Sequence, residues 1–124
     1  MFTTCAFDLL GQHVLIVEDE YFAAEALMES VRSGGGKVVG PVATVEEALA
    51  LLNRGETVDA AILDVNLGGD KVFPVARALR GHAVPIVFVT GYDDWIIPQE
   101  YEDVPVFRKP ADPDNVVRLL FERS

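Results

Sequence analysis

Cysteine and histidine are scarce in this chain of 124 residues, which contains one Cys and two His. A single thiol, Cys5, cannot form a disulfide within the chain, and so few Cys and His residues cannot complete a tetrahedral zinc site. The lack of disulfides is typical of a reducing compartment, so we expect a cytoplasmic protein.

Basic residues are also few, with 10 Lys plus Arg against 20 Asp plus Glu and a formal net charge of −10 at pH 7. Nucleic-acid binding depends on basic side chains that neutralise phosphates, so we expect no nucleic-acid partner. Long apolar stretches are absent as well. The longest, residues 83–89, includes Pro85 and is far shorter than the ~18 residues of a membrane-spanning helix. Residues 1–10 lack the basic cluster of a secretory signal, and we expect no membrane partner.

Half of the residues are apolar, and many gather in short runs without polar alternation. Such runs are typical of strands that are covered on both faces, as in parallel sheets. We predict five strands, at residues 14–17, 38–39, 60–63, 86–89 and 104–107. Residues 1–12 show no clear period, and we predict that they form an N-terminal extension before a single domain over residues 13–124.

Helical patterns fill the intervals between these runs. We predict helices over residues 21–32, 44–54 and 71–80, a short or irregular helix between 90 and 104, and a last helix from 112. In the first helix, Phe22, Ala26 and Leu27 fall on the apolar face. Thr44 and Asp70 precede the second and third helices as predicted N-caps. The last helix is predicted to begin at the Asp112–Pro113 pair, as a cap followed by an N1 proline.

Strands that alternate with helices predict right-handed βαβ units. We therefore expect an α/β fold of the flavodoxin-like type, with a doubly wound five-stranded parallel sheet in the order 2-1-3-4-5 and helices on both faces. Such sheets bind ligands at the carboxyl ends of the strands, beside the point between strands 1 and 3 where the order reverses.

Carboxylates follow two neighbouring strands of this sheet. Glu18, Asp19 and Glu20 come after the first predicted strand, and Asp64 follows the third. One interpretation is local, because Asp19 or Glu20 would suit the positive end of the next helix. The convergence of carboxylates from two strands favours a hard divalent cation instead, since clustered negative charges repel and Mg²⁺ prefers oxygen ligands.

Two further polar residues, Thr90 and Lys109, end the last two strands at the same edge. Taken singly, a Thr at a strand end often makes local hydrogen bonds, and a lone Lys is usually solvated. Beside Asp64 and Mg²⁺ they complete a set that phosphoryl transfer onto a carboxylate requires, with a nucleophile, a divalent ion, a hydroxyl donor and a fixed positive charge.

With these residues the chain resembles the receiver domain of two-component response regulators. The matching segments, each at the end of a predicted strand, are residues 14–20, 62–69, 87–92 and 107–110. The resemblance implies that Asp64 accepts phosphate from a phosphohistidine. It implies a Mg²⁺ site formed by Asp19, Asp64 and the backbone carbonyl of Asn66, with Glu18 as a further acidic residue.

The resemblance also implies roles for the last two strand ends. Thr90 would hydrogen-bond the phosphoryl oxygen, Lys109 would pair with it, and the Lys109–Pro110 bond would be cis. Two positions depart from the family pattern. Glu18 stands where Asp is commonest, which predicts weaker metal binding, and Val106 replaces an aromatic residue that often changes rotamer. Residues 85–92 are similar to a receiver subgroup with a Phe-Ala-Thr-Gly-type motif, so we hypothesise that ordering of the loop over 92–103 is the switch.

The expected function is a single-domain response regulator. A histidine kinase or histidine phosphotransfer protein would supply the phosphoryl group, and changed contacts with a downstream protein would carry the signal, because the last predicted helix uses the rest of the chain. Such a phosphoprotein is not an enzyme, although it assists its own phosphorylation and autodephosphorylation.

Two alternatives stay open. A haloacid-type Mg²⁺-dependent phosphatase also uses an Asp nucleophile, but Asn66 stands where those enzymes place a general acid. A degenerate receiver would bind partners without phosphorylation, against which the complete set of Asp19, Asp64, Thr90 and Lys109 argues.

Overall fold

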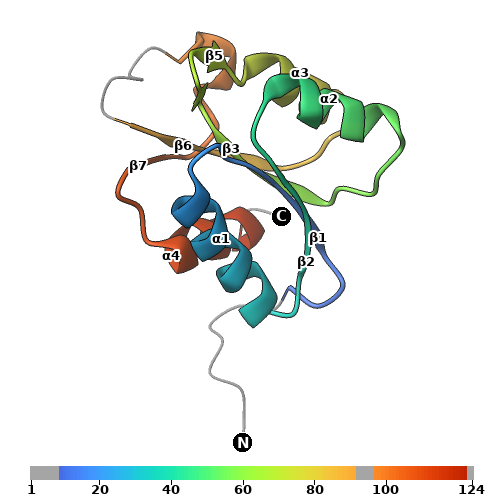
Figure 1. The fold of residues 1–124 in the computed structure, drawn as a ribbon, viewed down its shortest axis with the longest axis vertical. Helices are drawn as coiled ribbons and strands as arrows, with labels where there is room; N and C mark the ends of the chain where they lie inside the picture. Colours follow the sequence, from blue (N-terminus) through green and yellow to red (C-terminus); the bar gives the residue numbers. More distant parts are fainter. Residues whose placement is uncertain (1–8, 92–96, 123–124) are drawn as a thin grey trace, which may run out of the picture.

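The computed structural model describes residues 9–91 and 97–122. Its main sheet has five parallel strands, namely β1 (His13–Val17), β2 (Lys37–Val42), β3 (Ala60–Asp64), β6 (Ile86–Thr90) and β7 (Val106–Arg108). Their order across the sheet is β2-β1-β3-β6-β7 (Figure 1). This is the predicted 2-1-3-4-5 order, so the doubly wound, flavodoxin-like fold is confirmed.

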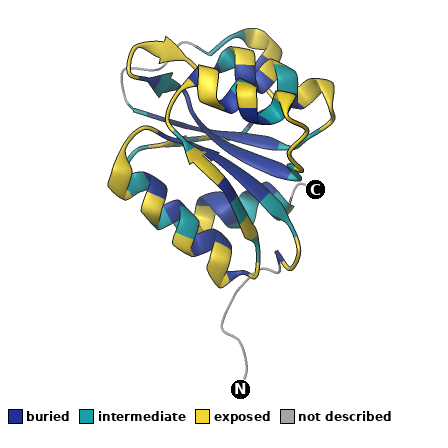
Figure 2. Cartoon of the chain, turned by 45° about the vertical axis from the view of Figure 1, so that its right-hand side comes forward, coloured by how far each residue is buried: buried dark blue, intermediate teal, exposed yellow. Residues whose placement is uncertain are grey.

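Helices cover both faces of the sheet. One face packs against α1 (Tyr21–Ser33) and α4 (Pro113–Glu122), and the other against α2 (Val45–Asn53) and α3 (Phe73–Gly81) (Figure 1). The central strands are buried on both sides (Figure 2). Leu15 and Leu63 belong to the core on the α2 and α3 side, whereas Ile16 and Ile62 belong to the core on the α1 and α4 side. Each such side chain contributes roughly 1.5–3 kcal/mol on burial, which explains why the strands lack polar alternation.

Predicted capping residues hold two of the helix starts. The Thr44 hydroxyl accepts a hydrogen bond from the Glu47 amide at 3.1 Å before α2. Before α4, an Asp112 carboxylate oxygen accepts the Asp114 amide at 3.0 Å. These bonds satisfy amides that have no partner within the helix, so both predicted starts are confirmed.

Two helix predictions are wrong in detail. The third helix begins at Phe73 rather than near residue 71, and Asp70 does not cap it. Asp70 and Lys71 instead form β5 (Asp70–Lys71), which pairs antiparallel with β4 (Asn66–Leu67). Gly68 and Gly69 adopt positive φ between them, which permits the tight turn.

In α1, Phe22 is 73% exposed instead of buried, while Leu27 is buried and Ala26 is half-buried. The buried face is centred on Ala24, Leu27 and Val31. Phe22 lies two residues before Ala24, about 200° away around the helix, so it points from this face into solvent.

The weak fourth helical pattern corresponds to a single 3₁₀ turn, η1 (Gln99–Tyr101), within the part of the region that is described. Residues 92–96 lie outside the described residues, so the hypothesis of a loop switch over 92–103 falls partly outside them too.

Of the predicted N-terminal extension, residues 9–12 are described. There the Leu9 side chain is buried, and its amide donates to the Gly34 carbonyl at 2.8 Å. Among the described residues, no helix combines the length and apolar character that crossing a membrane requires.

Candidate functional site

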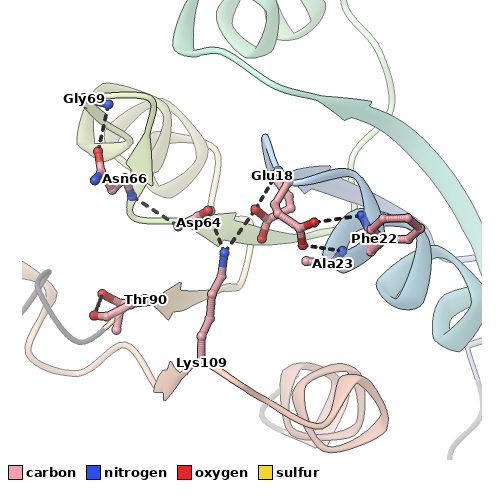
Figure 3. Close-up of polar contacts among 10 residues, drawn as sticks. Glu18, Phe22, Ala23, Asp64, Asn66, Gly69, Thr90 and Lys109 are labelled. Carbon is pink, nitrogen blue, oxygen red and sulfur yellow. Dashed lines mark hydrogen bonds and ion pairs between the residues drawn. The ribbon is translucent and has the colours of Figure 1, made fainter.

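The carboxyl ends of four strands place polar side chains at one edge of the sheet. Glu18 follows β1, Asp64 ends β3, Thr90 ends β6, and Lys109 follows β7. Residues from 18 to 109 meet here because parallel strands end at the same edge. The close-up view shows the side chains of Glu18, Asp64 and Lys109 directed toward one another (Figure 3).

Lys109 is the centre of this group. Its Nζ lies 3.1 Å from Oε2 of Glu18 and 3.1 Å from Oδ2 of Asp64, within hydrogen-bonding distance of both (Figure 3). The side chains of Glu18 and Asp64 are only 1% and 5% exposed. Buried carboxylates require such partners, because an unpaired charge in the interior is strongly unfavourable.

The buried surroundings change the pKa values of Glu18 and Lys109. Burial, followed by the hydrogen bond and charge interaction with Asp64, raises the pKa of Glu18 from 4.5 to about 7. Burial alone would lower the pKa of Lys109, but its interactions with Asp64 and Glu18 outweigh burial and raise it. The ammonium therefore stays charged at neutral pH and holds the two carboxyl groups together.

Three carboxyl groups are arranged as a cation would require. Oxygen atoms of Glu18, Asp19 and Asp64 all lie within 4.8 Å of one another. Asp19 is exposed, whereas the other two residues are buried, so the cluster opens to solvent on one side. One ammonium cannot balance three carboxylates, and all-oxygen ligands suit Mg²⁺, which keeps several waters. The donor set therefore fits this ion.

Glu20 takes the local role that the sequence left open. Its side chain accepts hydrogen bonds from the amides of Phe22 at 3.2 Å and Ala23 at 2.8 Å, as the N-cap of α1. Its own amide donates to Oε2 of Glu18 at 3.1 Å. The helix start therefore uses Glu20 and leaves Glu18 and Asp19 to the carboxylate cluster.

Asn66 and Thr90 border the cluster. The backbone amide of Asn66 donates a hydrogen bond to Oδ1 of Asp64 at 3.2 Å (Figure 3). The side-chain oxygen of Asn66 accepts a hydrogen bond from the Gly69 amide at 3.0 Å (Figure 3). The buried Thr90 donates its hydroxyl to the Gly91 carbonyl at 3.0 Å, so in this state it bonds locally. The Asn66 carbonyl stays a predicted metal ligand.

The β7 end fixes the lysine backbone. The Lys109 amide donates to the Thr90 carbonyl at 2.8 Å, which continues the β6 and β7 pairing beyond Arg108. The Lys109–Pro110 peptide bond is cis, as the sequence resemblance implied. A cavity of about 720 Å³ opens beside Lys109 between α1 and α4, and its lining includes Phe22, Leu27 and Val116.

The sequence reasoning missed one contributor to this edge, the end of β2. The Val42 carbonyl accepts the Glu18 amide at 2.9 Å. The signal was the Gly40–Pro41 pair, which interrupts the apolar run of the second strand.

Known proteins share this sequence pattern. A sequence profile described as the response regulator receiver domain matches residues 14–120. The chain belongs to this family. The solution structure of SdrG from Sphingomonas melonis Fr1 is 41% identical, with a TM-score of 0.76, and the match covers 90% of this chain and 97% of SdrG.

Two further proteins are similar to this chain, one over most of its own length and one over less than half of it. The receiver domain of the response regulator PhyR from Erythrobacter litoralis is 26% identical, with a TM-score of 0.77, over 92% of this chain and 89% of that one. The sensory transduction protein LytT from Bacillus subtilis (strain 168) is 28% identical over 111 residues, which are 86% of this chain and 46% of LytT. This receiver domain thus spans about half the length of LytT.

One departure from the family pattern is visible in this receiver domain. Val106, at the position where an aromatic switch residue is often found, lies on β7 and is 45% exposed. Val106 therefore brings no aromatic ring to this strand.

Proposed function

We propose that this receiver domain accepts a phosphoryl group on Asp64 and signals through changed protein contacts. The observation that carries the proposal is the contact of Lys109 with two buried carboxylates, beside a third carboxylate that suits a divalent cation. A carboxylate nucleophile, a fixed ammonium and a cation site are the parts that this chemistry requires.

In the proposed reaction, an Asp64 oxygen attacks the phosphorus of a phosphohistidine. The new Asp64 O–P bond forms as the histidine N–P bond breaks, and the electron pair stays on the imidazole. Asn66 holds Oδ1 of Asp64 through its amide, which fixes the orientation of the nucleophile. Lys109 then pairs with an oxygen of the transferred group in place of its present bond to Asp64.

Mg²⁺, held by Asp19, Asp64 and the Asn66 carbonyl with Glu18 nearby, would neutralise charge on the transferred phosphoryl oxygens. Thr90 would rotate its hydroxyl from the Gly91 carbonyl to a phosphoryl oxygen. The added charge of about −1.5 to −2 must be balanced at this acidic edge, so phosphorylation would rearrange the loops that carry these residues.

The partners that fit this chemistry are a histidine kinase or a histidine phosphotransfer protein as donor, and a protein target as receiver of the signal. With its single cysteine, the chain suits the reducing cytoplasm, where we expect these partners. Autodephosphorylation would end the signal: water would attack the phosphorus, the Asp64 O–P bond would break, and inorganic phosphate would leave.

The test is phosphorylation of the purified chain by acetyl phosphate, followed by intact-mass spectrometry. We expect one Mg²⁺-dependent phosphoryl adduct, which Asp64→Asn abolishes. Asp59→Asn is the matched control, because Asp59 precedes the opposite end of the same strand, where it accepts the His13 amide at 2.7 Å. An adduct that persists in Asp64→Asn would contradict the assignment of Asp64. The absence of any Mg²⁺-dependent adduct with acetyl phosphate in the wild type would favour a degenerate receiver.

A further inference from the structure

The edge strand β2 carries one residue more than the strand beside it. Leu15 pairs with Val39, but Val17 pairs with Val42, so β1 advances by two positions while β2 advances by three. The register shift falls at Gly40 and Pro41, where β2 carries one extra residue, and we refer to it as the bulge. Bulges near functional sites commonly redirect the chain, and a proline is tolerated here because β2 lies at the sheet edge.

Gly40 is the residue that the bulge requires. Its φ is +90°, a conformation that residues with a Cβ rarely adopt. A Cβ at this position would lie 2.9 Å from the Val42 amide nitrogen and 3.2 Å from the Ile16 carbonyl oxygen. Both neighbours are backbone atoms, so they cannot move aside without shifting β2 against β1.

The bulge brings β2 to the phosphorylation site. Because of the extra residue, Val42 lies beside Val17, and its carbonyl accepts the Glu18 amide at 2.9 Å. The buried carboxylate of Glu18 accepts a hydrogen bond from Nζ of Lys109 at 3.1 Å. The position of this carboxylate is therefore fixed by β2 through its backbone and by Lys109 through its side chain.

We propose that Gly40 is a positioning residue for the metal-binding carboxylates, acting through the Val42 carbonyl on Glu18. The effect on metal binding rests on the proposed function. The hydrogen bond between the Glu18 amide and the Val42 carbonyl does not depend on it. A substitution that displaces Val42 removes the backbone restraint on Glu18 and misplaces its carboxylate relative to Asp19 and Asp64. The sequence element responsible is the Gly40–Pro41 pair.

The test compares Gly40→Ala with Gly55→Ala. Gly55 also has a positive φ, of +80°, but a Cβ there meets nothing within 4 Å, so it controls for backbone strain alone. We expect both variants to melt at lower temperature, and only Gly40→Ala to weaken Mg²⁺ binding, by about tenfold in calorimetric titration. Equal Mg²⁺ affinities in the two variants would overturn the proposal.

Hydrogen exchange of the Glu18 amide gives a readout that does not depend on metal. In the wild-type chain this amide should exchange as slowly as the amides inside β1, and Gly40→Ala should accelerate it selectively. Fast exchange in the wild type would overturn the proposal even where Gly40→Ala fails to fold. If exchange behaves as expected but the wild type binds no Mg²⁺, the proposed function fails and the positioning of Glu18 stands.

A double variant assigns the effect to Glu18. In a Glu18→Gln background, the carboxylate that Gly40 positions has already lost its charge. Adding Gly40→Ala should then change Mg²⁺ affinity by less than about twofold, because the two substitutions act on one contact. Additive losses in the double variant would show that Gly40 acts by another route.

Discussion

Two groups of ion pairs in this receiver domain differ in burial. At the site, Lys109 contacts Glu18 and Asp64, whose side chains are 1% and 5% exposed. On the surface of α3, Arg77 contacts Glu100 in η1 and Arg80 contacts Asp103, which follows η1. In both pairs the side chains are more than a third exposed. The first group lies under the carboxyl edge of the sheet, and the second lies on the surface.

The difference teaches which charges the fold depends on. Removing one partner of a buried pair leaves an uncompensated charge inside the protein, whereas exposed partners are readily solvated. The site therefore holds its carboxylates under electrostatic constraint, and any cation or phosphoryl group that binds there changes this constraint. The surface pairs of Arg77 and Arg80 are under no such constraint, because water can solvate either partner when the other is removed.

The largest expected effect is that of Lys109→Met. Without the ammonium, Glu18 and Asp64 face each other without a counter-charge, and we expect a loss of about 3 kcal/mol in the free energy of unfolding without metal. Urea denaturation at pH 8 measures this loss. Saturating Mg²⁺ should restore most of it, because a cation replaces the missing positive charge. A variant as stable as the wild type without metal would show that the buried pair is not a constraint.

The next effect is a pH dependence from Glu18. Its pKa rises from 4.5 to about 7 on folding, so the folded state binds this proton more tightly than the unfolded chain. The stability that it contributes is full below pH 4.5 and is lost as the pH rises to 7. Without metal, the wild type should lose on the order of 2 kcal/mol relative to Glu18→Gln across this window.

Paired denaturation curves of the two proteins between pH 4.5 and 8 measure the difference, in which the other acidic groups cancel. Saturating Mg²⁺ should flatten the curve, because the bound cation favours the ionised carboxylate. A constant difference across the window in the absence of metal would mean that Glu18 titrates as an exposed carboxyl group does.

The fold could be predicted from sequence because its signals are local and repeated. The uninterrupted apolar runs around Leu15, Leu63 and Phe88 are readable as buried strands, and Thr44 and Asp112 mark helix starts. The β4 and β5 hairpin was missed, because two-residue strands have no period. Asp70 resembles a helix cap in sequence, but the turn at Gly68 and Gly69 places it in β5.

The site could be predicted only as a set of strand ends. Parallel topology brings Asp64 and Lys109 to one edge, and the structure places them together as expected. The sequence could not show that Glu20 caps α1 while Asp19 joins the carboxylate cluster. The two residues are adjacent and both acidic, and only the directions of their side chains in the folded chain separate their roles. The sequence could not assign a role to the Val42 carbonyl, since any residue type supplies a carbonyl. The Gly40–Pro41 pair indicated only that the second strand is interrupted.

The smallest expected effects belong to the surface pairs, and they sharpen the comparison. The Arg80 guanidinium makes two bonds to Asp103, at 3.1 and 3.2 Å, and lies 5.5 Å from the ring centre of the buried Tyr101. The contact of Arg77 is longer, with 3.7 Å between its guanidinium nitrogen and Oε1 of Glu100. We expect Arg80→Ala to cost about 1 kcal/mol of unfolding free energy, and Arg77→Ala less than about 0.5 kcal/mol. Denaturation at low and high salt checks both, because salt should shrink a purely ionic loss and leave the packing of Arg80 on Tyr101 intact. A loss for either variant as large as that of Lys109→Met would remove the distinction between buried and exposed pairs.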